Sequence, residues 1–238
     1  MIETPLLITA SIDVFSPHTA ICDKEERLNQ YISALKEIFS QKVFLNIVFC
    51  ENTGYSKQEF LNKVDVPEYV NFEYISFNGD KNCVLIFGKG YGEGEIIKYS
   101  LNQSELLNHY EYFFKLTGRL YVRNISMFLR KETKTFFFRP PSLEQNKIDT
   151  RFYCVSKNFY LNNLLNAYLD VNDDKGYFLE HAFNDKLSKI RKNSFSFFYP
   201  DIIGLSGSTG NVYTLSLARK LKLLIKSFCK HSLVRIEK

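Results

Sequence analysis

The 238-residue sequence contains no tryptophan and few cysteines: Cys22, Cys50, Cys83, Cys154 and Cys229. Their number is odd, they lie far apart, and no two form a Cys-x-x-Cys pair. This pattern argues against a disulfide framework and against a structural zinc site. A chain of this length buries roughly 70% of the surface that its unfolded form exposes, so its core needs neither kind of cross-link.

Long apolar runs are also absent. No segment approaches the about 18 uninterrupted apolar residues of a transmembrane helix. The N-terminus carries Glu3 where a signal peptide carries basic residues, and the apolar run after it is very short. The sequence therefore predicts a cytoplasmic protein.

Excess basic charge is missing from most of the chain. Residues 219–238 hold seven lysines and arginines and one acid, whereas the rest of the chain holds 24 bases and 25 acids. A nucleic-acid-binding domain usually spreads basic residues over a whole face. A nearly neutral body with one basic end does not fit this class, so we expect no nucleic-acid partner.

Apolar runs and helical stripes alternate in the first third of the chain. The pattern predicts strands at 6–14, 43–50 and 70–77 and helices at 24–39 and 56–63. This β-α-β-α-β order indicates an α/β fold with a mostly parallel central sheet.

The remaining sequence gives more mixed signals. We expect helices at 95–102, 104–109, 158–169 and 177–190, and strands at 112–122, 136–138 and 152–155. The sequence shows no internal repeat and no low-complexity linker. We therefore predict one domain over residues 1–213, followed by a basic segment at 214–238.

Polar residues follow several predicted strands. Asp13 ends the first strand, and Glu51 and Asn52 end the second. In open α/β sheets ligands bind beyond the carboxyl ends of the strands. These side chains are therefore candidates for a binding site.

A glycine-rich segment, Gly88-Lys-Gly-Tyr-Gly-Glu-Gly, precedes the helix expected at 95–102. Its glycines would let the backbone approach a ligand closely, and the helix that follows offers free N–H groups to a phosphate. A flexible turn before a helix N-terminus is an equally good interpretation, because the spacing matches neither a Walker A loop nor a Rossmann fingerprint.

Two bases lie beside a tight turn in Lys115-Leu-Thr-Gly-Arg119. Thr117 and Gly118 form the turn, so Lys115 and Arg119 could converge on an anion. Alternatively, the bases form salt bridges on an edge strand.

Leucine, isoleucine and phenylalanine alternate with bases at helical spacing in residues 215–238. On a helix this gives an apolar stripe flanked by positive charge, which suits an anionic membrane surface. We predict a C-terminal basic amphipathic helix with this role. A helix docked on the sheet with its basic face exposed is the alternative.

Five segments follow one another in a distinctive order: Gly88-Lys-Gly-Tyr-Gly-Glu-Gly-Glu, Phe113-Phe-Lys-Leu-Thr-Gly-Arg, Asp149-Thr-Arg-Phe-Tyr, Tyr177-Phe-Leu-Glu-His and Gly204-Leu-Ser-Gly-Ser-Thr-Gly. This order resembles a family of bacterial glycosyltransferases that are encoded with capsule, O-antigen and lipooligosaccharide synthesis. The resemblance covers about residues 6–213, and Lys-Leu-Thr-Gly-Arg and Gly-Leu-Ser-Gly-Ser are its most specific parts.

The resemblance implies a single GT-A-like (Rossmann-type) domain that moves a sugar from a UDP- or CMP-sugar to a glycan, in particular a lipid-linked surface glycan. Such an acceptor agrees with the membrane contact expected of residues 215–238, so we expect a cytoplasmic protein that is peripheral on the inner face of the cytoplasmic membrane. The residues expected to bind the donor and its phosphates are Asp13, Glu51, Asn52, Lys89, Gly90, Glu93, Lys115, Thr117, Gly118 and Arg119.

GT-A domains usually clamp the diphosphate with a metal ion held by an Asp-x-Asp motif. The strand that should carry this motif, residues 113–122, holds Lys115 and Arg119 instead. Fixed positive charge can neutralise a leaving phosphate as a divalent cation does. We therefore expect an enzyme without cofactor or metal site, with Mn²⁺ or Mg²⁺ dependence as the alternative.

An inverting transfer needs a carboxylate that takes the proton of the acceptor hydroxyl. Glu180 matches the position of that base at the start of a helix, and aromatic neighbours would raise its pKa. Asp149 is the second candidate, with Arg151 as its partner or as an acceptor contact. His181 could bind acceptor or phosphate, although a packing role is the commoner one.

Ser206, Gly207 and Ser208 lie in a loop rich in small hydrogen-bond donors. This loop could cover the substrate, or it could be a plain linker. Two other functions stay open for the chain: a nucleotidyltransferase that makes an activated sugar, and a non-catalytic interaction module of a polysaccharide assembly complex.

Overall fold

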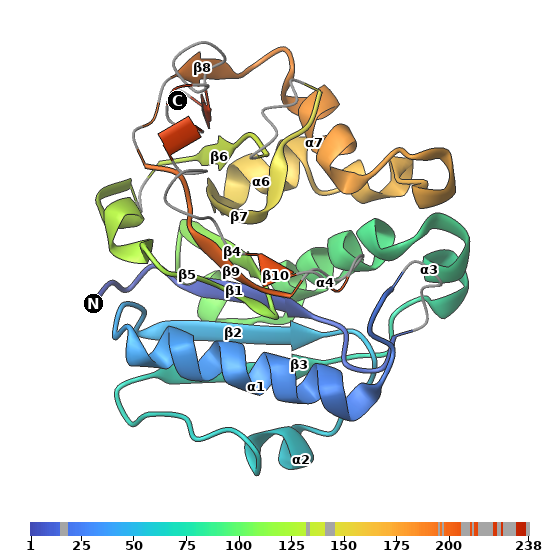
Figure 1. The fold of residues 1–238 in the computed structure, drawn as a ribbon, viewed down its shortest axis with the longest axis vertical. Helices are drawn as coiled ribbons and strands as arrows, with labels where there is room; N and C mark the ends of the chain where they lie inside the picture. The colour runs from blue at the N-terminus through green and yellow to red at the C-terminus, as the bar shows by residue number, and fades with distance from the viewer. Residues whose placement is uncertain are drawn as a thin grey trace.

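The computed structural model describes residues 1–14, 19–131, 134–140, 146–194, 196, 198–205, 210, 212–213, 221–222, 225 and 232–236. Within these residues a central sheet has the strand order β3-β2-β1-β4-β7-β6-β11-β8 (Figure 1). Its strands are β1 (Leu6–Ala10), β2 (Asn46–Glu51), β3 (Asn71–Ser76), β4 (Tyr112–Thr117), β6 (Phe136–Phe138), β7 (Asp149–Ser156), β8 (Lys192–Ser194) and β11 (Leu233–Arg235).

The sheet is parallel in its first half and antiparallel in its second. Strand β1 pairs in parallel with β2 and β4, and β2 pairs in parallel with β3. Every later pairing is antiparallel, so that β7 and β11 run against the other six strands. The predicted α/β fold with a mostly parallel sheet is therefore confirmed.

Helices cover both faces of this sheet. On one face, α1 (Lys24–Ser40) and α2 (Lys57–Leu61) pack against the strands; on the other lie α4 (Lys89–Gln103), α5 (Glu105–Asn108), α6 (Lys157–Asn163) and α7 (Leu179–Leu187) (Figure 1). The short α3 (Lys81–Phe87) precedes α4, and three segments of 3-10 helix follow later in the chain: η1 (Ile125–Lys131), η2 (Ala167–Asp170) and η3 (Asp173–Lys175).

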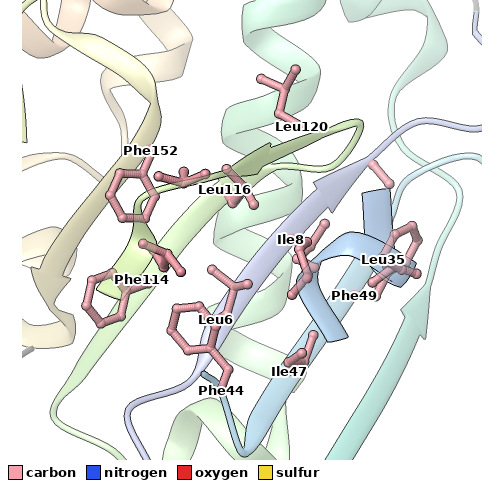
Figure 2. Packing of buried hydrophobic residues seen from close by; sticks show 14 of the residues in the cluster. Leu6, Ile8, Leu35, Phe44, Ile47, Phe49, Phe114, Leu116, Leu120 and Phe152 are labelled. Atoms are coloured by element: carbon pink, nitrogen blue, oxygen red, sulfur yellow. The ribbon is translucent and has the colours of Figure 1, made fainter. Parts of the chain in front are cut away.

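Alternation along the buried strands divides the core into two layers. Leu6 and Ile8 face the α1 layer together with Phe49 and Phe114, as Figure 2 shows, whereas Leu7 belongs to the layer under α4 and α7. Successive side chains of a strand point to opposite faces, so continuous apolar runs are what a sheet covered on both faces requires. This is why the sequence indicated these strands clearly.

A second, small sheet holds β5 (Leu120–Val122), β9 (Ile202–Leu205) and β10 (Val212–Tyr213) in the order β10-β9-β5. Strand β5 follows β4 after the turn expected at Thr117-Gly118. A Cβ on Gly118 would lie 2.6 Å from the backbone oxygen of Thr9, so glycine lets this turn approach β1 closely.

Three predictions from the sequence need correction. The glycine-rich segment is not a loop before a helix, because α4 already begins at Lys89. The helix expected at 158–169 ends at Asn163 and is followed by η2. The segment 214–238 lies largely outside the described residues, but its end forms β11, in which Leu233 and Val234 are buried between β6 and β8. These two residues therefore cannot contact a membrane.

Within the described residues, no helix is long and apolar enough to cross a membrane.

Candidate functional site

A cavity of about 840 Å³ opens beyond the carboxyl ends of β1 and β4. Its walls come from the end of β1, from α1, from the N-termini of α4 and α7, and from β7. Ligand pockets commonly have volumes of roughly 300–1,000 Å³ and lie at this edge of open α/β sheets. The cavity is therefore the candidate site.

Residues predicted from the sequence supply much of its lining. Those that line it are Lys89, Gly90, Glu93, Thr117, Arg119, Asp149, Arg151 and Glu180. Residues 88–94, 115–119, 149–151 and 180 are thus brought to one place from four separate parts of the chain.

Other predicted residues lie outside the lining. The carboxylate of Glu51 is fully buried and accepts hydrogen bonds from the backbone of Thr53 and Tyr55, both at 2.8 Å. Asn52 accepts a hydrogen bond from Ser11 Oγ at 2.6 Å, which ties the end of β2 to the end of β1. The Asp13 backbone N–H donates to Thr53 Oγ1 at 3.3 Å. These residues hold the strand ends together beneath the cavity.

His181 is also a structural residue. Its Nδ1 accepts a hydrogen bond from the backbone N–H of Phe178 at 3.0 Å, and its ring stacks on Phe178 and Tyr177. These contacts close the N-terminal turn of α7. The predicted loop residues Ser206, Gly207 and Ser208 lie outside the described residues.

Lys115 is completely buried under the floor of the cavity. Its Nζ forms an ion pair with Glu93 and donates to Thr117 Oγ1 at 2.9 Å and to the backbone oxygen of Thr150 at 2.7 Å. The Thr117 hydroxyl in turn donates to Glu93 at 3.1 Å. Lys115 has no exposed surface, so the expectation that it contacts a ligand is corrected: it neutralises Glu93.

Glu180 stands in the first turn of α7 and faces the cavity. Two contacts tie it to β7: its backbone oxygen accepts from Ile148 N at 3.1 Å, and its carboxylate accepts from Thr150 Oγ1 at 3.3 Å. Burial raises the pKa of Glu180, and the charges of Glu93 and Asp149 raise it further. A carboxylate held in this way can accept a proton from a bound ligand.

Asp149 is occupied by Arg151. Arg151 donates from Nε and Nη2 to the two carboxylate oxygens of Asp149, at 2.9 and 2.6 Å. Burial disfavours the charge of Arg151, but Asp149 outweighs burial and raises the pKa of the guanidinium. The Arg151 guanidinium also lies 4.7 Å from the centre of the Tyr213 ring. The pair forms part of the wall of the cavity.

Two arginines also line the cavity. Arg119, between β4 and β5, is 8% exposed, and Arg27, in the first turns of α1, is 4% exposed. None of the described carboxylates forms an ion pair with either residue.

The sequence analysis did not identify Arg27, because an arginine near a helix start resembles a surface residue. Its spacing of four from Tyr31, on the buried face of α1, is the signal that could have found it.

The glycines of the 88–94 segment serve close packing. A Cβ on Gly94 would lie 2.0 Å from the Cβ of Tyr168, and one on Gly90 would lie 3.3 Å from the Cβ of Leu179. Gly88 has φ +98° and leads into Lys89, whose N–H donates to Asp173 Oδ2 at 3.0 Å. The glycines bring α4 against η2 and α7, and so bring Glu93 beside Lys115.

No model of a protein family and no curated sequence matches this chain. Among solved structures, the chain is similar to a candidate nucleotide-diphospho-sugar transferase from Desulfovibrio desulfuricans G20, with a TM-score of 0.50 and 8% identity over 79% of this chain and 77% of that one. It is also similar to the bifunctional glycosyltransferase WbbM in its apo form, with a TM-score of 0.49 and 11% identity over 97% of this chain and 45% of that one.

A third similar structure is the mannosyltransferase Ktr4p from S. cerevisiae in complex with GDP, with a TM-score of 0.42 and 10% identity over 78% of this chain and 66% of that one. The likeness to the Desulfovibrio structure confirms the GT-A-like fold, which is the fold of nucleotide-sugar transferases. At 8% identity it shows the fold and no more.

Proposed function

We propose that the protein is a glycosyltransferase that moves a sugar from a nucleotide-sugar donor to a glycan acceptor in this cavity. The observation that carries the proposal is that a carboxylate with a raised pKa and two buried arginines line the same cavity. Glu180, a carboxylate with a raised pKa, faces it from α7, and Arg119 and Arg27 face it from the β4–β5 turn and α1. The likeness in fold to a candidate nucleotide-diphospho-sugar transferase supports the same class.

The geometry favours one arrangement of the two substrates. The donor nucleotide lies along the end of β1, where Arg119 and Arg27 face its phosphates. The acceptor enters beside β7 and α7, where Glu180 and the Asp149–Arg151 pair form the wall.

The reaction then follows as a direct displacement. The acceptor oxygen forms a bond to the anomeric carbon as the bond from that carbon to the phosphate oxygen breaks. Glu180 takes the proton of the acceptor hydroxyl, and the phosphate leaves with the electron pair, facing Arg119. Attack opposite to the leaving group inverts the anomeric carbon.

The residues at the end of β4 do not suit a metal ion. Thr117, Gly118 and Arg119 stand there, and none of them offers a carboxylate. In the part of the chain that the structure describes, no three histidine, cysteine or acidic side chains are placed to share a cation. Of the carboxylates that line the cavity, Glu93 forms an ion pair with Lys115 and Asp149 forms one with Arg151. The absence of a carboxylate at the end of β4 supports the proposal of a transfer without a metal ion.

The proposed acceptor is a lipid-linked surface glycan, and the proposed location is the inner face of the cytoplasmic membrane. The bases of residues 219–230 support this proposal, because each base near an anionic surface contributes on the order of 1 kcal/mol. Flotation with vesicles that contain anionic lipid tests it. Binding that weakens as salt is raised supports it, and absence of binding at low salt contradicts it.

Thermal unfolding with a panel of UDP, GDP, CMP, their sugars, nucleoside triphosphates and sugar 1-phosphates, in EDTA, tests the proposed function. A ligand at 100 times its dissociation constant adds about 2.7 kcal/mol, or roughly 5–10 °C for a chain of this size. We expect one nucleotide family to give this shift. A shift with a nucleoside triphosphate and a sugar 1-phosphate alone would favour a nucleotidyltransferase. No shift with any nucleotide would favour a non-catalytic module.

A further inference from the structure

Arg119 and Arg27 are two buried positive charges that line the cavity and interact electrostatically with each other. Arg119 comes from the turn after β4, and Arg27 comes from α1. Both are more than nine-tenths buried, and among the described residues neither forms an ion pair with a carboxylate. The nearest acid on α1, Glu26, is exposed and reaches Arg119 through Gln30, which accepts from Arg119 Nη1 at 2.8 Å and donates to Glu26 at 3.2 Å.

The two guanidinium groups differ in how much of their hydrogen-bonding capacity the protein uses. Arg27 donates from Nε at 2.9 Å to the Ser11 backbone oxygen, from Nη1 at 3.1 Å to the Ile21 oxygen, and from Nη2 at 3.2 Å to Tyr31 Oη. Arg119 makes one hydrogen bond within the described residues, to Gln30. A guanidinium has five N–H donors, so four donors of Arg119 make no hydrogen bond to the described residues.

A buried guanidinium without an anion is unfavourable, and two of them together are more so. Burial lowers the pKa of Arg119, and the like charge of Arg27 lowers it as well. An anion in the cavity between them would relieve both effects. A phosphate suits the planar fork of Arg119, which can donate two parallel hydrogen bonds to it.

We propose that Arg119 binds the phosphates of the donor directly, with Arg27 as a second fixed positive charge, and that the donor is therefore a nucleoside-diphosphate sugar. The inference rests on the proposed function and deepens it. Two guanidinium charges match a leaving diphosphate, whereas the single phosphate of a CMP-sugar needs less neutralisation. Lys115 takes no part, because Glu93 neutralises it beneath the floor.

Calorimetric titration of the whole chain in EDTA tests this assignment with UDP, GDP, CMP, uridine, guanosine and inorganic pyrophosphate. We expect one nucleoside diphosphate to bind more tightly than CMP and than its own nucleoside, and pyrophosphate to compete with it. Arg119→Gln should lower the affinity for the nucleoside diphosphate about 10- to 100-fold, which is the range for the loss of one or two charge-assisted hydrogen bonds. Arg119→Lys keeps the positive charge but loses the planar fork, so its affinity should lie between those of the unchanged protein and Arg119→Gln.

Arg123→Gln is the matched control, since Arg123 lies at the end of β5 with an exposed side chain outside the cavity. It should bind as the unchanged protein does, and the melting temperature of each variant confirms that it folds. If Arg119→Gln binds the nucleoside diphosphate as tightly as the unchanged protein does, the assignment of Arg119 is overturned and the proposed function still stands. Tighter binding of CMP, or a gain of tenfold or more with Mn²⁺, also overturns it. No binding of any nucleotide or of pyrophosphate overturns both.

Discussion

Lys115 and Glu180 are held by the same residue, Thr150. The backbone oxygen of Thr150 accepts from Lys115 Nζ at 2.7 Å, and its hydroxyl donates to Glu180 Oε1 at 3.3 Å. The buried Lys115–Glu93 pair is therefore joined to the proposed base through one position of β7. A change at Lys115 is expected to act on Glu180 without any contact between the two.

Lys115→Met should destabilise the protein by about 3 kcal/mol. It leaves Glu93 as a carboxylate without its cation, and breaking a buried pair costs roughly 3–5 kcal/mol, less where one partner is partly exposed as Glu93 is. The double variant Lys115→Met/Glu93→Gln should recover most of the loss, because no unpaired charge remains. Urea unfolding of the two single variants and the double variant measures this, and additive losses would show that the pair is not coupled.

Gly94→Ala should destabilise the protein by about 1–3 kcal/mol, although alanine favours a helix more than glycine does. Its Cβ would lie 2.0 Å from the Cβ of Tyr168, so α4 and η2 would have to move apart. Gly92→Ala, in the same helix, meets its nearest atom at 3.1 Å and should cost less. Equal stability of the two variants would mean that this segment tolerates side chains as a loop does.

The stability of Glu180→Gln should depend on pH in a defined direction. Burial raises the pKa of Glu180 in the folded protein, so the ionised carboxylate destabilises the fold above that pKa. Glutamine removes this cost. At pH 7.5 the variant should melt at the same temperature as the unchanged protein or higher, and the difference should shrink as the pH falls towards 4. A variant that melts much lower at pH 7.5 would indicate that Glu180 is a stabilising residue.

The acid limb of the pH profile should follow the charges around Glu180. Because the base must be ionised, kcat/KM should fall as the pH falls through a pKa above the ordinary glutamate value of about 4.3. Lys89 lowers this pKa, whereas Glu93 and Asp149 raise it. Lys89→Gln should therefore move the limb to higher pH, and Lys36→Gln, on the exposed side of α1, should not move it. A limb unaffected by Lys89 would point to another base.

The sequence predicted the first half of the fold well because its strands are buried on both faces and read as continuous apolar runs. The short strands β8, β9 and β11 gave no such signal. The site was predicted in part: Glu180, Asp149 and Arg119 line the cavity, as expected of candidate ligand contacts. The partner of Lys115 stayed hidden, because Glu93 is 22 residues away and reaches it only once the glycines of α4 pack against η2 and α7.

Release of nucleotide from a panel of nucleotide sugars, in EDTA, tests the central claim most directly. The unchanged protein should release the nucleotide of one donor, slowly to water and faster with a glycan acceptor. Glu180→Gln should lower the rate of transfer about 10²- to 10⁴-fold while it binds the nucleotide with unchanged affinity. Equal rates in the two proteins would contradict the role of Glu180, and no release from any donor would contradict the proposed glycosyltransferase itself.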